Sequence, residues 1–179
     1  LVNKKFLDKG IRYAQLSNNN DLKLEAQICE ATYLKEKFNS NPKSISIQKI
    51  IDSYEKAIQL AKNQTSNKMN VAMAYLNYAN FLVTNTQEES HSLYNIDKAL
   101  FYGQKYQIVS IVRNCYGIKG LYFINKNKLE EAEKSFLDGI EYLKKLPFKE
   151  YETEKKFYND LKEISASKKD FVSYHKYDL

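Results

Sequence analysis

The sequence predicts an all-α protein built from repeated helix pairs, and three observations support that prediction. The 179 residues include only 2 prolines and 5 glycines, which is too little turn chemistry for a β-sandwich of this size. Strong helix formers such as Leu, Ala, Lys, Glu and Gln are abundant. One short helical pattern also recurs four times along the chain, and such recurrence is typical of repeat proteins.

The recurring pattern centres on a small residue. It occurs at Gly10, Ala57, Ala99 and Gly139, which are 47, 42 and 40 residues apart. Each of these residues follows a large apolar residue by three positions and precedes Ile or Leu directly. Residues three and four apart share a helix face, so a small residue in that face lets a second helix approach closely. We call the helices that carry this pattern B helices.

A second pattern lies between the B helices. Ala31, Ala79 and Gly120 each precede a large apolar residue by three positions, and each comes before the next B helix. We call the helices that carry these residues A helices. The chain therefore alternates A and B helices, and we expect each pair to pack as an antiparallel hairpin.

Breakers and caps set the order of the elements. The polar segment 17–21 ends the first helix and offers N-caps for the second, Pro42 separates the second from the third, and Pro147 stops the seventh. We expect helices over 3–17, 21–38, 44–62, 67–84, 88–105, 107–125, 129–146, 149–165 and 169–178.

Residues 113–147 resemble one tetratricopeptide repeat. The residues that match the family pattern are Tyr116, Gly120, Phe123, Ala132, Phe136, Gly139 and Pro147. Tyr116 replaces the usual Trp, Lys119 stands where the family prefers Leu, and the proline comes late. The spacing between repeats also exceeds the family's usual period of about 34 residues. In this longer spacing the chain is similar to the long-repeat variants of the family. HEAT repeats share the longer period but fit the small-and-aromatic pattern less well.

The resemblance extends more weakly over nearly the whole chain and implies a single domain of 1–179. Within it, 1–17 resembles a B helix without its partner, 21–62, 67–105 and 107–147 resemble repeats, and 149–179 resembles a degenerate terminal hairpin. The family's fold implies that the hairpins stack into a right-handed α-α superhelix.

The resemblance also implies that the chain binds a protein or peptide in a concave groove lined by the A helices. The groove residues that it implies are Thr32, Lys35, Met73, Leu76, Asn80, Asn114, Gly117 and Leu121, with Glu25, Ile28, Val83 and Ile124 beside them. Asn80 and Asn114 are the first choices, because an amide side chain both donates and accepts hydrogen bonds. The Lys/Asn clamp with which some family members hold a C-terminal carboxylate is not reproduced.

The end of the chain, 169–179, is similar to the last repeat of bacterial regulators that carry an N-terminal tetratricopeptide sensor region. This similarity implies a sensor segment of a larger signalling or transcription-regulatory protein. The chain lacks an initiator Met, and we expect an excised fragment. A free-standing adaptor, a small-molecule receptor and a nucleic-acid-binding helical repeat are the alternatives.

The remaining motifs favour no enzyme, metal site or cofactor. His91 and His175 lie far apart without other ligands at metal-binding spacing, and no phosphate-binding or nucleophile motif occurs. Cys29 and Cys115 form no paired motif, and we expect both to be buried.

The net charge of +6 comes from interspersed charges, so nucleic-acid contact is not indicated. No apolar run reaches the length of a membrane span, and the compartment is undefined: cytoplasmic is the default, periplasmic the alternative for a membrane-anchored parent.

Overall fold

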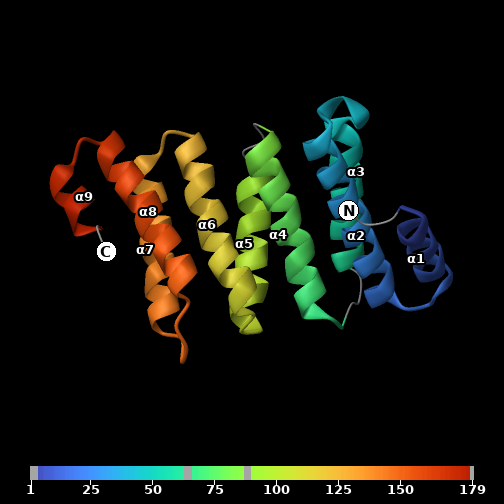
Figure 1. Ribbon diagram of the computed structural model, residues 1–179. Coiled ribbons are helices and arrows are strands. Elements are labelled where there is room, and N and C mark those ends of the chain that lie inside the picture. The colour runs from blue at the N-terminus through green and yellow to red at the C-terminus, as the bar shows by residue number, and fades with distance from the viewer. Residues whose placement is uncertain (1–3, 63–65, 87–89, 178–179) are drawn as a thin grey trace. The chain divides into compact units, whose positions relative to one another are not determined.

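The computed structural model describes residues 4–62, 66–86 and 90–177, and every regular element in these residues is helical. The elements are α1 (Lys4–Leu16), α2 (Asn20–Ser40), η1 (Pro42–Ser44, a 3-10 turn), α3 (Ile47–Lys62), α4 (Lys68–Asn85), α5 (Ser90–Lys105), α6 (Val109–Asn125), α7 (Leu129–Lys144), α8 (Tyr151–Ser167) and α9 (Phe171–Lys176) (Figure 1). The predicted all-α class is confirmed.

The predicted helix bounds agree with the described ones to within three residues. The largest difference is at α3, which begins at Ile47 because Pro42–Ser44 forms the separate turn η1. The side chain of Asn41 accepts a hydrogen bond from the Lys43 N–H at 3.2 Å and caps this turn. The predicted starts at 3 and 88 and the predicted end at 178 lie outside the described residues.

The chain forms two compact units, Leu1–Ile108 and Val109–Leu179. In the first unit each of α1 to α4 packs against the next helix along the chain, and α2 also packs against α4. In the second unit α6 packs against α7, α7 against α8, and α8 against α9 (Figure 1). Sequential neighbours are therefore spatial neighbours within each unit. The single-domain organisation over 1–179 stays a prediction.

The small residues of the repeated pattern lie inside the hairpins of the first unit. Ala31 and Ala57 in the α2–α3 pair, and Ala79 and Ala99 in the α4–α5 pair, are all 0% exposed. Aromatic rings fill the space beside these contacts: Tyr54 of α3 stacks on Tyr78 of α4 at 5.4 Å between ring centroids. The burial of these alanines is what close helix approach at these positions requires.

Two glycines have the same role in the second unit. A Cβ atom at Gly120 of α6 would lie 2.3 Å from the ring of Phe136 in α7. A Cβ atom at Gly139 of α7 would lie 2.7 Å from the ring of Phe157 in α8 and 3.0 Å from the Cβ of Tyr116 in α6. All three distances are shorter than van der Waals contact, so these positions have no room for a side chain.

Gly10 is the exception among the small residues, because no other helix approaches it closely. A Cβ atom at Gly10 would meet nothing within 4 Å. Its helix, α1, packs on α2, and Ala14 is buried there, but Gly10 itself is exposed. Phe6 and Tyr13, which share the face of Gly10, are each 70% exposed. The apolar face of α1 is thus wider than the part of it that α2 covers.

Three helices end in the same hydrogen-bonded turn, and none of these turns uses glycine. Gln107, Asn127 and Lys169 have φ values of 55°, 55° and 58°. After each of them the next backbone N–H donates to a carbonyl five residues earlier: Ile108 to Gly103, Lys128 to Phe123 and Asp170 to Ser165, at 2.8–2.9 Å. This is the Schellman arrangement, which satisfies the last carbonyl groups of a helix.

We predict opposite effects of one substitution at two glycines. Gly139→Ala should lower the free energy of unfolding by about 1–3 kcal/mol, because the new methyl group overpacks the contact with Phe157 and Tyr116. Gly10→Ala should leave it unchanged or raise it by up to about 1 kcal/mol, because alanine favours the helix and meets open space. Urea titration followed by circular dichroism measures both. A Gly139→Ala protein as stable as the parent would contradict the packing described above.

Candidate binding surface

The predicted groove residues of the first unit lie on two helices that pack against each other. Thr32 and Lys35 belong to α2, and Met73, Leu76 and Asn80 belong to α4. Spacings of three and four residues place each set on one face of its helix. Both sets therefore lie on neighbouring helices of one unit, and their role in a ligand groove stays a prediction.

The predicted groove residues on α2 and α4 differ in exposure, and this difference separates those that a ligand can reach from those that pack in the core. Thr32, Lys35, Met73 and Asn80 are half-buried, so their side chains remain accessible to a ligand. Leu76 is only 6% exposed, which makes it a packing residue beneath them. The neighbouring positions Ile28 and Val83, at 5% and 6% exposure, are buried in the same way, whereas Glu25 is exposed. We name the four accessible residues Thr32, Lys35, Met73 and Asn80 the α2–α4 surface.

Asn80 offers the strongest hydrogen-bonding group on the α2–α4 surface. Its backbone carbonyl accepts a bond from the Thr84 hydroxyl at 2.7 Å, but its side-chain amide bonds to no other described residue. A half-buried amide with a free donor and a free acceptor can pair with a peptide backbone. Lys35 adds a positive charge and Met73 an adaptable apolar contact beside it.

A buried hydroxyl lies close to this surface. Tyr54 of α3 is 1% exposed, and its hydroxyl has no hydrogen-bond partner among the described residues. Burial raises the pKa of Tyr54 above its ordinary value of 10, and the nearby Thr32 side chain offsets part of that rise. The Tyr54 hydroxyl is thus a buried donor without an acceptor among the described residues.

The other predicted groove residues lie on α6 in the second unit. Asn114 is exposed, and Leu121 is 38% exposed. Gly117 lies between them on the same face, where a Cβ atom would stand 3.4 Å from the ring of Phe157 in α8. Ile124 is half-buried. The role of this set in a ligand groove stays a prediction.

Two single side chains differ from what the sequence indicates. Tyr122 lies one position off the apolar stripe of its helix, which indicates exposure, but it is 7% exposed and its ring packs edge-on against Phe123 at 5.2 Å. Cys29 was expected to be buried, but it is exposed on α2, one turn from Glu25 and Thr32. Partial burial, with the charge of Glu25, raises the pKa of its thiol. Cys115 is buried, as expected.

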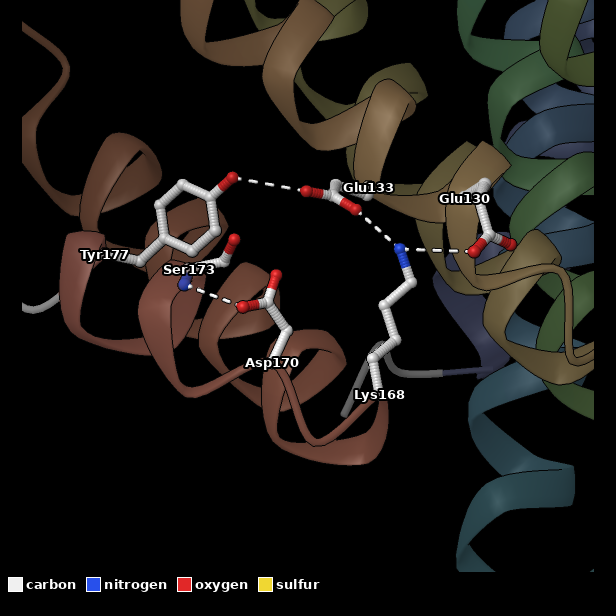
Figure 2. A network of polar contacts seen from close by, with 6 residues as sticks. All are labelled: Glu130, Glu133, Lys168, Asp170, Ser173 and Tyr177. Atoms are coloured by element: carbon white, nitrogen blue, oxygen red, sulfur yellow. Dashed lines mark hydrogen bonds and ion pairs between the residues drawn. The ribbon is translucent and has the colours of Figure 1, made fainter.

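A polar network of Glu130, Glu133, Lys168 and Tyr177 holds the end of α8 and the short helix α9 against α7 (Figure 2). The Lys168 ammonium donates to Glu133 at 2.8 Å and pairs with Glu130 at 3.3 Å. The Tyr177 hydroxyl donates to the other oxygen of Glu133 at 3.3 Å. One carboxylate thus binds two groups from the C-terminal segment, and Figure 2 shows it between them.

The charges of the network shift its pKa values in the directions expected for ion pairs. The hydrogen bond to Glu133 raises the pKa of Lys168 above 10.5. A bond to its own backbone N–H, followed by the bond to Lys168, lowers the pKa of Glu130 below 4.5. Asp170 caps α9 by accepting from the Ser173 N–H at 3.1 Å. The network therefore acts as a clip that anchors α9.

The described residues contain no cluster of three His, Cys, Asp or Glu side chains placed to hold a metal ion. None of their helices is both long enough and apolar enough to cross a lipid bilayer.

We predict that Tyr54→Phe leaves the free energy of unfolding unchanged or raises it by up to about 1 kcal/mol, because it removes a buried hydroxyl that lacks a partner. Tyr78→Phe is the matched change, since its hydroxyl donates to Glu55 at 3.4 Å, and it should cost about 0.5–1.5 kcal/mol. Chemical denaturation of both variants tests this. A larger loss for Tyr54→Phe than for Tyr78→Phe would mean that the Tyr54 hydroxyl has an acceptor.

We also predict that Lys168→Met releases α9. Amide hydrogen exchange in α9 should accelerate, while the free energy of unfolding falls by about 1 kcal/mol, as for a partly exposed ion pair. Lys149→Met, a change at an exposed lysine, is the control and should alter neither.

The clip should also depend on pH. The lowered pKa of Glu130 means that its contribution is present above pH 4.5 and is lost as the pH falls through the lowered value. The raised pKa of Lys168 means that its contribution is present below pH 10.5 and is lost above the raised value. Protection factors, which correct each exchange rate for its intrinsic dependence on pH, are the measure. Protection in α9 that is unchanged in acid, or unchanged in Lys168→Met, would contradict the role given to the network.

Comparison with known proteins leaves the chain without an assigned family. No protein-family model matches it, and no curated protein matches its sequence. Any statement about its function therefore depends on the repeat pattern and on the packing described above.

Proposed function

We propose that the chain is a tetratricopeptide-like helical repeat that binds a protein or peptide segment and is not an enzyme. In this proposal its hairpins stack into a right-handed superhelix, and the α2–α4 surface contributes to the ligand groove. The wider role proposed is that of a sensor or regulatory segment in a larger bacterial signalling or transcription-regulatory protein. A free-standing adaptor is the alternative.

The observation that carries the proposal is the repeated burial of small residues in successive hairpins. Ala31, Ala57, Ala79 and Ala99 are fully buried in the first unit, and Gly120 and Gly139 have no room for a side chain in the second. The two glycine contacts join neighbouring helices, and all six small residues recur at equivalent places in the sequence pattern. Stacked hairpins of this kind leave one series of helix faces free for a ligand.

The chemistry of the α2–α4 surface supports a peptide ligand over the alternatives. It combines an amide without a described partner at Asn80, a thioether at Met73 and one cation at Lys35. A peptide backbone requires such mixed donors and acceptors. Nucleic acid would require a concentration of basic side chains on one face, and this surface carries a single lysine.

The proposal is tested by selecting peptides from a displayed random library on the immobilised chain. Fluorescence polarisation then gives the affinity of a selected peptide for the parent and for variants. We expect Asn80→Ala to weaken binding at least about tenfold, as for an interface contact of roughly 1.4 kcal/mol, and to change the free energy of unfolding by less than about 0.5 kcal/mol.

Asn159→Ala, an exposed asparagine of α8, is the matched control and should bind as the parent does. Failure to enrich any peptide, or equal affinity for the parent and Asn80→Ala, would overturn the assignment of this surface. Binding of a labelled single-stranded oligonucleotide in place of peptide would favour the nucleic-acid alternative.

A further inference from the structure

A second concave surface lies among α1, α2 and α3 in the first unit. It is a cleft of about 440 Å³, a size within the range of ligand-binding sites. Its polar lining consists of Gln15 from α1, Lys23 and Gln27 from α2, and Lys56 and Gln59 from α3, over apolar side chains of the same helices. We name it the α1–α3 cleft.

The α1–α3 cleft is separate from the α2–α4 surface. On α2, Lys23 lines the cleft and Thr32 belongs to the α2–α4 surface. They are nine residues apart, which is about two and a half turns, so they project from opposite sides of the helix. A ligand in the cleft therefore does not occupy the surface proposed above.

The charged side chains that line the cleft are all positive. Its lining contains two ammonium groups and no carboxylate. Neither Lys23 nor Lys56 is in an ion pair with another described residue. The cleft between α8 and α9 is different, because there Lys155 and Lys162 are accompanied by Glu152 and Glu154. An anionic ligand in the α1–α3 cleft would thus meet two ammonium groups that form no ion pair with a described residue, although the Glu30 carboxylate lies next to the cleft, bound to the Gln27 amide.

The wall between α2 and α3 is held in place by hydrogen bonds. The Gln27 amide nitrogen donates to the Ser53 hydroxyl at 2.9 Å and to the Glu30 carboxylate at 2.7 Å. The amides of Gln15 and Gln59 make no bond to another described residue. The cleft therefore combines a fixed wall with two side chains free to hydrogen-bond a ligand backbone.

We propose that the α1–α3 cleft binds an extended peptide segment rich in Asp or Glu. The two lysines attract the carboxylates, the glutamine amides pair with the backbone, and the apolar floor receives an aliphatic side chain of the ligand. Sites for compact small molecules are lined mostly by apolar and aromatic groups, whereas this lining consists largely of long polar side chains without an aromatic ring. Single-stranded nucleic acid would require aromatic stacking, which the lining does not supply.

The test uses a short fluorescein-labelled peptide in which glutamates alternate with leucines, with the whole chain as receptor. Two further peptides replace the glutamates by glutamine or by lysine. We expect the glutamate peptide to bind more tightly than both, and its affinity to fall as salt is added. We expect the double variant Lys23→Glu/Lys56→Glu to bind it at least tenfold more weakly than the parent.

The matched control is Lys134→Glu/Lys156→Glu, which changes the net charge by the same amount at exposed lysines of α7 and α8. It should keep most of the affinity, which separates a local site from attraction by the charge of the whole chain. Circular dichroism should show equal helix content and melting temperature for both double variants. Hydrogen exchange should show protection by the peptide in α1, α2 and α3.

Three results would overturn the proposal: no binding of the glutamate peptide, equal binding of the glutamine peptide, or equal losses in the two double variants. Asn80→Ala distinguishes this site from the proposed groove. It should not change the affinity for the glutamate peptide, and a loss there would place the acidic peptide on the α2–α4 surface instead. The acidic-peptide site can therefore fail while the proposed function stands, and the reverse also holds.

Discussion

Close contact between paired helices is the constraint on which the rest of this structure depends. Interiors of proteins are packed as densely as organic crystals, so a helix that approaches its neighbour must either omit a side chain or move away. Gly120 and Gly139 omit it altogether, and the rings of Phe136 and Phe157 take the vacated space. Large aromatic residues are thus tolerated in the core because glycine or alanine stands opposite them.

That constraint also explains which parts of the fold the sequence could predict. The positions of the helices follow from breakers and caps, such as Pro42 and the Asn19 side chain, which accepts from the Asp21 and Leu22 N–H groups at the start of α2. The buried small residues follow from their recurrence at equivalent places. Both signals are local, since each lies within a single helix or turn.

The sequence could not predict which neighbour covers an apolar face. Gly10 carries the same pattern as Gly139, yet one stands in open space and the other against Phe157 and Tyr116. Exposure at Cys29 and burial at Tyr122 depend in the same way on the helix next to them, and not on their own sequence context. The candidate groove residues came from the resemblance to tetratricopeptide repeats, and Leu76 could be separated from Asn80 only by its burial. The α1–α3 cleft draws on three helices, and no single segment of sequence carries a sign of it.

The pair of cysteines has a practical consequence for studying the chain. Cys115 of α6 is buried, whereas Cys29 of α2 is exposed, one turn from Thr32. A thiol-reactive dye or spin label should therefore attach at Cys29 without any engineered residue. The raised pKa of the Cys29 thiol means that labelling proceeds faster at alkaline pH, where more thiolate is present. A probe attached there stands on α2, the helix that contributes to both surfaces, and so offers a native optical or magnetic reporter of occupancy on either side.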